Sequence, residues 1–84
     1  MTQRYLPSEL DINGMIAELR SWGWRDYKIE AVCGMSEGHI YHIMAGRSRF
    51  MAYQRAVRLY NFWIDEKLLR DPHFEPIRVE CVTT

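Results

Sequence analysis

The stretch YKIEAVCGMSEGHIYHIMAGRSR, residues 27–49, holds two short helical patterns, one on either side of Gly34. In each pattern apolar residues recur at three- and four-residue steps, which places them on one face of a helix. These residues are Ile29, Val32 and Cys33 before the glycine, and Ile40, Ile43 and Met44 after it. Because glycine readily adopts the left-handed conformation that ends a helix, the stretch predicts two brief helices joined by a tight turn.

We expect the first helix at residues 25–33 and the second at residues 37–45. The Asp26 carboxylate suits the positive N-terminal end of the first helix, and Ser36 is a preferred N-cap residue for the second. Gly46 then ends the second helix. Helices this short need tertiary packing to persist, so other segments must cover them.

A helix is predicted on each side of this pair. Residues 10–22 carry apolar side chains at helical steps, with Ser8 as the N-cap and Gly23 as the left-handed residue at the end. Residues 52–70 carry a second apolar stripe, which stops at the helix-breaking Asp71–Pro72. The stripe comprises Tyr53, Val57, Tyr60, Ile64 and Leu68.

The segment at residues 52–70 also has more apolar surface than one face of a small domain requires. Its additional apolar residues are Leu59, Phe62, Trp63 and Leu69. They either wrap a small core or, where they are exposed, form a contact between subunits.

The tail sequence IRVECV, residues 77–82, alternates apolar and charged side chains as a strand does. A strand needs a pairing partner. We consider the same strand of a second subunit, with a frayed tail as the alternative. The candidates for a dimer interface are therefore Leu59, Phe62, Trp63, Ile77 and Val79.

Eighty-four residues, 48% of them hydrophobic, make one small folded domain. Its helical core spans residues 8–70, and a tail follows at residues 71–84. The two cysteines, Cys33 and Cys81, fall short of the four or more of a disulfide-stapled domain, so we expect free thiols in a reducing cytoplasm. The opening MTQRYLPSELD lacks the apolar run of a signal peptide, and no segment approaches the ~20 apolar residues of a membrane span.

Eleven acidic and eleven basic residues give a net charge of zero, but they are unevenly distributed. No Asp or Glu occurs from Gly38 to Ile64, a segment that contains four arginines and two histidines. The arginines are Arg47, Arg49, Arg55 and Arg58, with Ser48, Tyr53 and Gln54 among them. Such donors suit phosphate oxygens, although a solvated basic face is the alternative.

The histidines His39 and His42, three residues apart, raise the alternative of a metal or catalytic site. A zinc site needs three or four ligands, and the cysteines stand at helix-core and tail positions without the spacing of zinc ligands. The sequence pairs no serine or cysteine nucleophile with a base, and it has no phosphate-binding loop ending in GK[ST]. We therefore expect no metal, no cofactor, no small-molecule substrate and no enzymatic activity.

Residues 10–70 as a whole resemble a helix-turn-helix domain of the Cro and phage-repressor type, the lambda-repressor-like fold. The opening stretch carries the resemblance: a turn glycine with apolar residues at the positions that the motif requires. These are Gly34 at the turn, Ile29 before it, and Met35, Ile40 and Ile43 after it. The AGR at residues 45–47 is similar to the N-G-[KR] ending of the family's recognition helix.

The chain departs from the family pattern at two positions. Glu30 stands where a small residue is usual, so close packing of the two helices requires its side chain to swing outward. Asp26 stands where a glutamine that bonds phosphate is usual, so this anchoring either passes to Arg25 or Lys28 or is weaker here.

The resemblance implies an all-α fold, a small bundle of four to five helices with the helix-turn-helix at residues 25–46 and a short C-terminal extended or strand segment. It also implies that the second helix of the motif lies in the major groove of DNA. The base-reading candidates, carried over by position, are Glu37, Gly38, His39, Tyr41 and His42. The phosphate-binding candidates are Ser36, Arg25, Lys28, Arg47, Ser48, Arg49, Gln54 and Arg55.

The function implied is that of a sequence-specific regulator that binds double-stranded DNA, a Cro-like repressor of phage, prophage or plasmid origin. Such a protein occupies its operator as a homodimer at the nucleoid in the bacterial cytoplasm. The alternative is a protein-protein interaction module, an antitoxin half or an assembly adaptor, that uses the same fold without reading DNA.

The sequence predicts two different kinds of DNA-binding defect. Replacing Arg47 and Arg49 together by alanine should weaken binding to every duplex, because contacts to phosphate carry no sequence information. His42→Ala or Glu37→Ala should instead change the preferred sequence. A gel-shift titration measures both effects, and unchanged binding in both sets of variants would contradict the DNA-binding interpretation.

Overall fold

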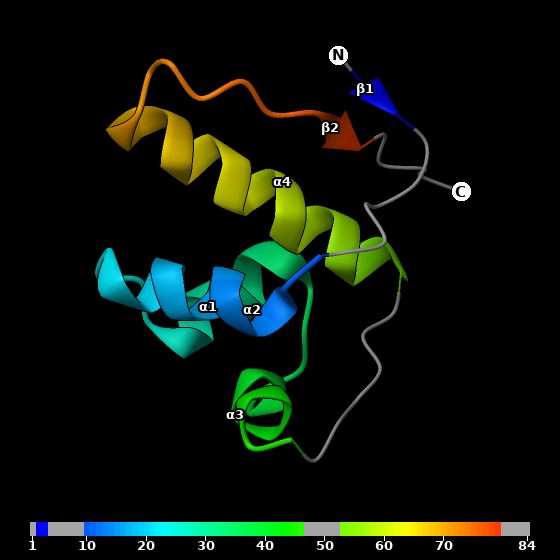
Figure 1. Ribbon diagram of the computed structural model, residues 1–84. Helices are drawn as coiled ribbons and strands as arrows, with labels where there is room; N and C mark the ends of the chain where they lie inside the picture. The colour runs from blue at the N-terminus through cyan, green and yellow to red at the C-terminus, as the bar shows by residue number, and fades with distance from the viewer. Residues whose placement is uncertain (1, 4–9, 47–52, 80–84) are drawn as a thin grey trace.

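The longest helix, α4 (Tyr53–Arg70), forms the centre of the molecule (Figure 1). This computed structural model describes residues 2–3, 10–46 and 53–79. Within these ranges the elements follow the order β1 (Thr2–Gln3), α1 (Ile12–Ser21), α2 (Asp26–Cys33), α3 (His39–Met44), α4 and β2 (Arg78–Val79). The prediction of a small, mostly helical domain with a short C-terminal strand is confirmed.

Helix α1 ends as predicted and begins differently. Gly23 has a φ of 96°, and the N–H groups of Gly23 and Trp24 donate to the carbonyls of Arg20 and Leu19, both at 3.0 Å. This is the paired hydrogen bonding of a Schellman C-cap. At the other end Asp11 is the N-cap, and its side chain accepts a hydrogen bond from the Gly14 N–H at 3.0 Å. The prediction of Ser8 as N-cap is wrong for this reason; Ser8 itself lies outside the described residues.

The turn between α2 and α3 depends on two glycines. Gly34 has a φ of 72°, and a Cβ added there would lie 2.7 Å from Nη1 of Arg58. Gly38, with φ 83° and ψ −3°, is the third residue of a turn closed by the His39 N–H, which donates to the Ser36 carbonyl at 3.2 Å.

A positive φ is incompatible with a right-handed helix, so α3 begins at His39 and not at residue 37 as expected. Ser36 is therefore not the N-cap, and Gly38 takes that position without a side-chain hydrogen bond.

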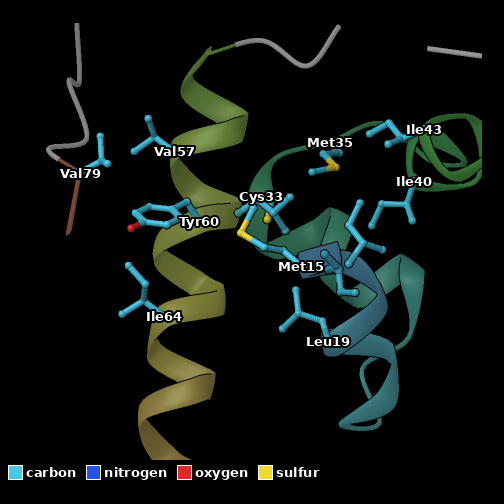
Figure 2. Packing of buried hydrophobic residues seen from close by; sticks show 13 residues of the cluster. Met15, Leu19, Cys33, Met35, Ile40, Ile43, Val57, Tyr60, Ile64 and Val79 are labelled. Atoms are coloured by element: carbon cyan, nitrogen blue, oxygen red, sulfur yellow. The ribbon is translucent and has the colours of Figure 1, made fainter. Parts of the chain in front are cut away.

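The core lies on two sides of α4 (Figure 2). Val57, Tyr60 and Ile64 point toward Val79 of β2, while Leu19 and other side chains of α1 and α2 lie on the opposite side of the helix. Because α4 is covered on two sides, most of its additional apolar side chains are buried or partly buried within the monomer.

This packing corrects one predicted interface residue and one predicted core residue. Leu59, predicted at a dimer interface, is fully buried in the monomer and is not available for a contact between subunits. Val32, predicted in the core of α2, is 49% exposed, whereas Glu30 of the same helix is buried. Phe62, a second interface candidate, packs edge-on against Trp24 with ring centroids 4.7 Å apart.

The predicted C-terminal strand has its partner within the chain. β2 pairs in parallel with β1, with Thr2 opposite Arg78 and Gln3 opposite Val79. The Asn61 side chain of α4 also donates to the Val79 carbonyl at 2.9 Å and accepts from the Val79 N–H at 3.3 Å.

The N–H and C=O of Val79 are thus occupied by Asn61, and its side chain is buried. This corrects Val79 as a dimer-interface residue, and for Arg78 and Val79 the pairing with β1 takes the place of the two alternatives considered for the strand. Residues 80–82 of the predicted strand lie outside the described residues.

No helix in the described ranges has both the length and the apolar character that crossing a membrane requires.

The buried Cys33 thiol gives a test of this core. Burial raises its pKa from 9.0 to about 11, and the positive charge of Arg58 opposes the shift only in part. Because the thiolate is the reactive form, iodoacetamide at pH 8 should modify Cys33 about a hundredfold more slowly in the native protein than in urea. Mass spectrometry of the Cys33 peptide measures both rates, and equal rates would contradict the packing.

The same shift sets a pH dependence. Since the folded-state pKa lies above the unfolded one, this thiol's contribution to stability is complete below pH 9.0 and decreases as the pH rises toward about 11.

Candidate nucleic-acid interface

Helix α3 lies at the opposite end of the molecule from the strand pair (Figure 1). Its inner residues Ile40 and Ile43 are buried in the core, while Tyr41 is 59% exposed and His42 is exposed beside it. The rings of Tyr41 and His42 meet edge to face with centroids 5.7 Å apart. Glu37, in the turn that precedes the helix, is also exposed. Three of the predicted base-reading side chains therefore lie on the outer side of α3 and its turn.

His39 does not share this exposed position. It is half-buried, and its Nε2 atom is enclosed without a hydrogen-bond partner among the described residues. Helical side chains point toward the N-terminus of their helix, so a ring on the first residue of α3 covers the preceding turn. Of the two histidines among the base-reading candidates, only His42 is exposed. Gly38 is half-buried in that same turn.

Glu30 has a role that the sequence did not indicate. Its side chain, in a residue only 5% exposed, accepts a hydrogen bond from the backbone N–H of Ile40 at 3.0 Å. The first N–H groups of a helix lack partners within the helix, and the N-cap Gly38 has no side chain to supply one. Glu30 therefore caps α3 from α2. The expected outward orientation of Glu30 is wrong, because its side chain is buried between α2 and α3, where it accepts the Ile40 hydrogen bond.

The predicted phosphate-binding residues fall into three groups. Ser36, Arg25 and Lys28 are exposed on the turn and at the beginning of α2. Gln54 is exposed and Arg55 half-buried on the first turn of α4. Arg47, Ser48 and Arg49 lie outside the described residues.

Arg58 belongs to the acid-free segment but was not among the predicted phosphate-binding residues; it is exposed and has its guanidinium against Gly34. There it faces the C-terminal end of α2, the end of a helix that favours a positive charge.

An open groove of about 660 Å³ separates the beginning of α2 from the beginning of α3. Its lining includes Arg25, Tyr27, Tyr41 and the buried Glu30. Asp26 also lies on this groove, and both of its carboxylate oxygens accept hydrogen bonds from Arg20, at 2.8 and 2.7 Å. The pairing offsets the negative charge that Asp26 would otherwise present to a phosphate.

Among the described residues, no three His, Cys, Asp or Glu side chains come together as a metal site requires. Cys81, one of the ligands considered from the sequence, lies outside these residues.

No family model matches the chain, and no curated protein or solved structure is significantly similar to it. The basis for a functional proposal is therefore the surface formed by α2, α3 and the beginning of α4.

The Glu30 contact is open to a direct test by substitution. Glu30→Ala leaves the Ile40 N–H without an acceptor in a buried place and should lower the free energy of unfolding by about 1–3 kcal/mol. Glu30→Gln keeps an acceptor oxygen and should cost about 1 kcal/mol. Urea unfolding followed by circular dichroism measures both changes.

The matched control is Glu37→Ala, which removes an exposed carboxylate and should change stability by about 0.5 kcal/mol or less. Equal stability of the Glu30→Ala and Glu37→Ala variants would show that Glu30 does not hold α3.

Proposed function

We propose that this protein is a sequence-specific regulator that binds double-stranded DNA through a helix-turn-helix, α2 and α3, within a lambda-repressor-like bundle. The observation that carries the proposal is the position of α3. On its inner side, α3 is held by the buried residues Ile40 and Ile43 and by the Glu30 hydrogen bond. On its outer side, Tyr41 and His42 are exposed. A rigid helix with a polar outer face, next to cationic side chains, suits the major groove of DNA.

Each outward side chain has a chemical counterpart on a base edge. The Glu37 carboxylate can accept a hydrogen bond from a cytosine amino group, and His42 can donate one to guanine. The Tyr41 hydroxyl can do either. His39 is omitted from this set because its Nε2 atom is enclosed.

The surrounding polar and cationic residues would hold the duplex backbone. Arg25 and Lys28 stand on one side of α3 in the sequence, and Gln54 and Arg55 follow it on α4. Arg47, Ser48 and Arg49 belong to the same proposed set by their sequence position. Because the molecule carries no net charge, we expect modest affinity for non-specific DNA, with a steep decrease as salt rises.

Regulation would be steric, since an occupied operator blocks or recruits polymerase without any chemistry by the protein. One short helix contacts few base pairs, so we propose a homodimer on a two-fold operator, with half-sites about 34–36 Å apart. Leu69, near the end of α4 and 78% exposed, is an apolar side chain available for the contact between subunits.

In vitro selection of duplexes from a random pool tests this proposal. We expect a palindromic consensus, since each subunit of the dimer reads one half-site. His42→Ala should alter the consensus at one position per half-site, because a lost base contact costs about 1–3 kcal/mol of discrimination.

His73→Ala is the matched control, since His73 is another exposed histidine, outside α3. A pool without enrichment would contradict DNA reading and favour the protein-interaction module. Sedimentation that shows a monomer at tens of micromolar would contradict the dimer.

A further inference from the structure

A second groove, with a volume of about 450 Å³, lies between α1, α4 and the segment that leads into β2. Its apolar lining includes Tyr60, Trp63, Phe74, Pro76 and Ile77. None of these residues belongs to α2 or α3, so the groove is separate from the proposed DNA surface. Its volume is within the range of ligand-binding sites in proteins.

Aromatic side chains fixed against one another form the floor of this groove. The rings of Tyr60 and Trp63 stack with centroids 6.1 Å apart, and Phe74 meets Trp63 edge-on at 5.8 Å. The Tyr60 hydroxyl donates to the Ile77 carbonyl at 2.9 Å, which ties the two walls together. Ile77 itself remains 44% exposed. The groove is thus a preformed apolar surface that is still open to solvent.

The charge around the groove is mainly negative. The carboxylates of Asp11, Glu18 and Glu75 line it, and no Lys, Arg or His is among the described residues that line it. Lys67 places its Nζ over the rings of Trp63 and Phe74, at 4.8 and 4.7 Å. With Lys67 included, three carboxylates face one ammonium group, so the site favours a cationic ligand.

This charge pattern decides between occupants. A nucleic acid or an anionic membrane surface would be repelled by the carboxylates. A second copy of the chain, docked by two-fold symmetry, would place the same acidic rim against itself. A segment of another protein that combines apolar residues with Lys or Arg meets both the aromatic floor and the acidic rim.

The Trp63 side chain adds a further observation. Its indole N–H is shielded from solvent and has no hydrogen-bond acceptor among the described residues. A peptide that packs on the Trp63 ring changes the surroundings of this N–H, which can therefore report binding.

We propose that this groove binds an extended, basic and apolar peptide segment of a partner protein. Proline-rich segments are the best fit, because a polyproline II helix is already ordered and docks in aromatic-lined grooves. The protein would then hold a partner on one face while α3 faces DNA, and the peptide site does not depend on DNA binding.

The test begins with selection of twelve-residue peptides, displayed as a random library, against the full chain. We expect enrichment of sequences that combine Arg or Lys with Pro and Leu. A fluorescein-labelled peptide of the selected sequence is then titrated by anisotropy, and the same peptide with Glu in place of each cation is the ligand control. Binding should weaken as salt rises, and the Trp63 indole N–H resonance should shift on binding.

Two variants locate the site. Ile77→Lys should weaken binding of the selected peptide at least about tenfold, and Glu18→Gln combined with Glu75→Gln about fivefold. Val32→Lys is the matched control, because Val32 is an aliphatic residue of similar exposure on α2, 49% against 44%. It should leave peptide binding unchanged, and circular dichroism should show that all the variants are folded.

Three results would overturn the proposal. One is a library from which no peptide is enriched. Another is an enriched peptide whose affinity is the same for the Ile77→Lys and Val32→Lys proteins. The third is a dimer that Ile77→Lys dissociates while no peptide binds, since the occupant would then be a second copy of the chain.

Discussion

The hydrogen bond from the Ile40 N–H to the buried Glu30 side chain fixes α3 on α2, and the arrangement of the outer face follows from it. Gly34 allows the chain to turn under Arg58, and Gly38 brings it to the start of α3 without a side-chain cap. Neither glycine can satisfy the first N–H groups of the helix. A carboxylate from the neighbouring helix does so, and a six-residue helix that would not persist alone keeps one orientation.

The chain has zero net charge, but its charged residues are unevenly distributed. Near α3 the cations Arg25 and Lys28 are exposed, and no acidic residue occurs in the sequence from Gly38 to Ile64. The aromatic groove beside α1 is lined by three carboxylates. Asp26, which lies on the groove between α2 and α3, is paired with Arg20. The two proposed binding surfaces therefore differ in charge, as ligands of opposite charge would require.

Several features of the fold could be predicted from local sequence. The helices of α1, α2 and α4 follow from apolar periodicity, and Gly23 and Gly34 end helices as expected, both with positive φ. Some predictions failed because a backbone conformation nearby in the chain was not foreseen. Ser36 is a good N-cap by type, but Gly38 has a backbone conformation that delays the helix. The site was predicted in part. Glu37, Tyr41 and His42 are exposed around α3, whereas His39 is half-buried.

The sequence by itself determined which segments become helical, where glycine ends them, and which stretch lacks negative charge, because each of these depends on residues close together in the chain. The tertiary structure decided how the surplus of α4 is covered, that β1 pairs with β2, and that Glu30 caps α3. These outcomes depend on contacts between residues ten to more than seventy positions apart, as in the bond from Ile40 to Glu30 and the pairing of Thr2 with Arg78. A periodicity shows that a face must be buried, and only the packed chain shows which element buries it.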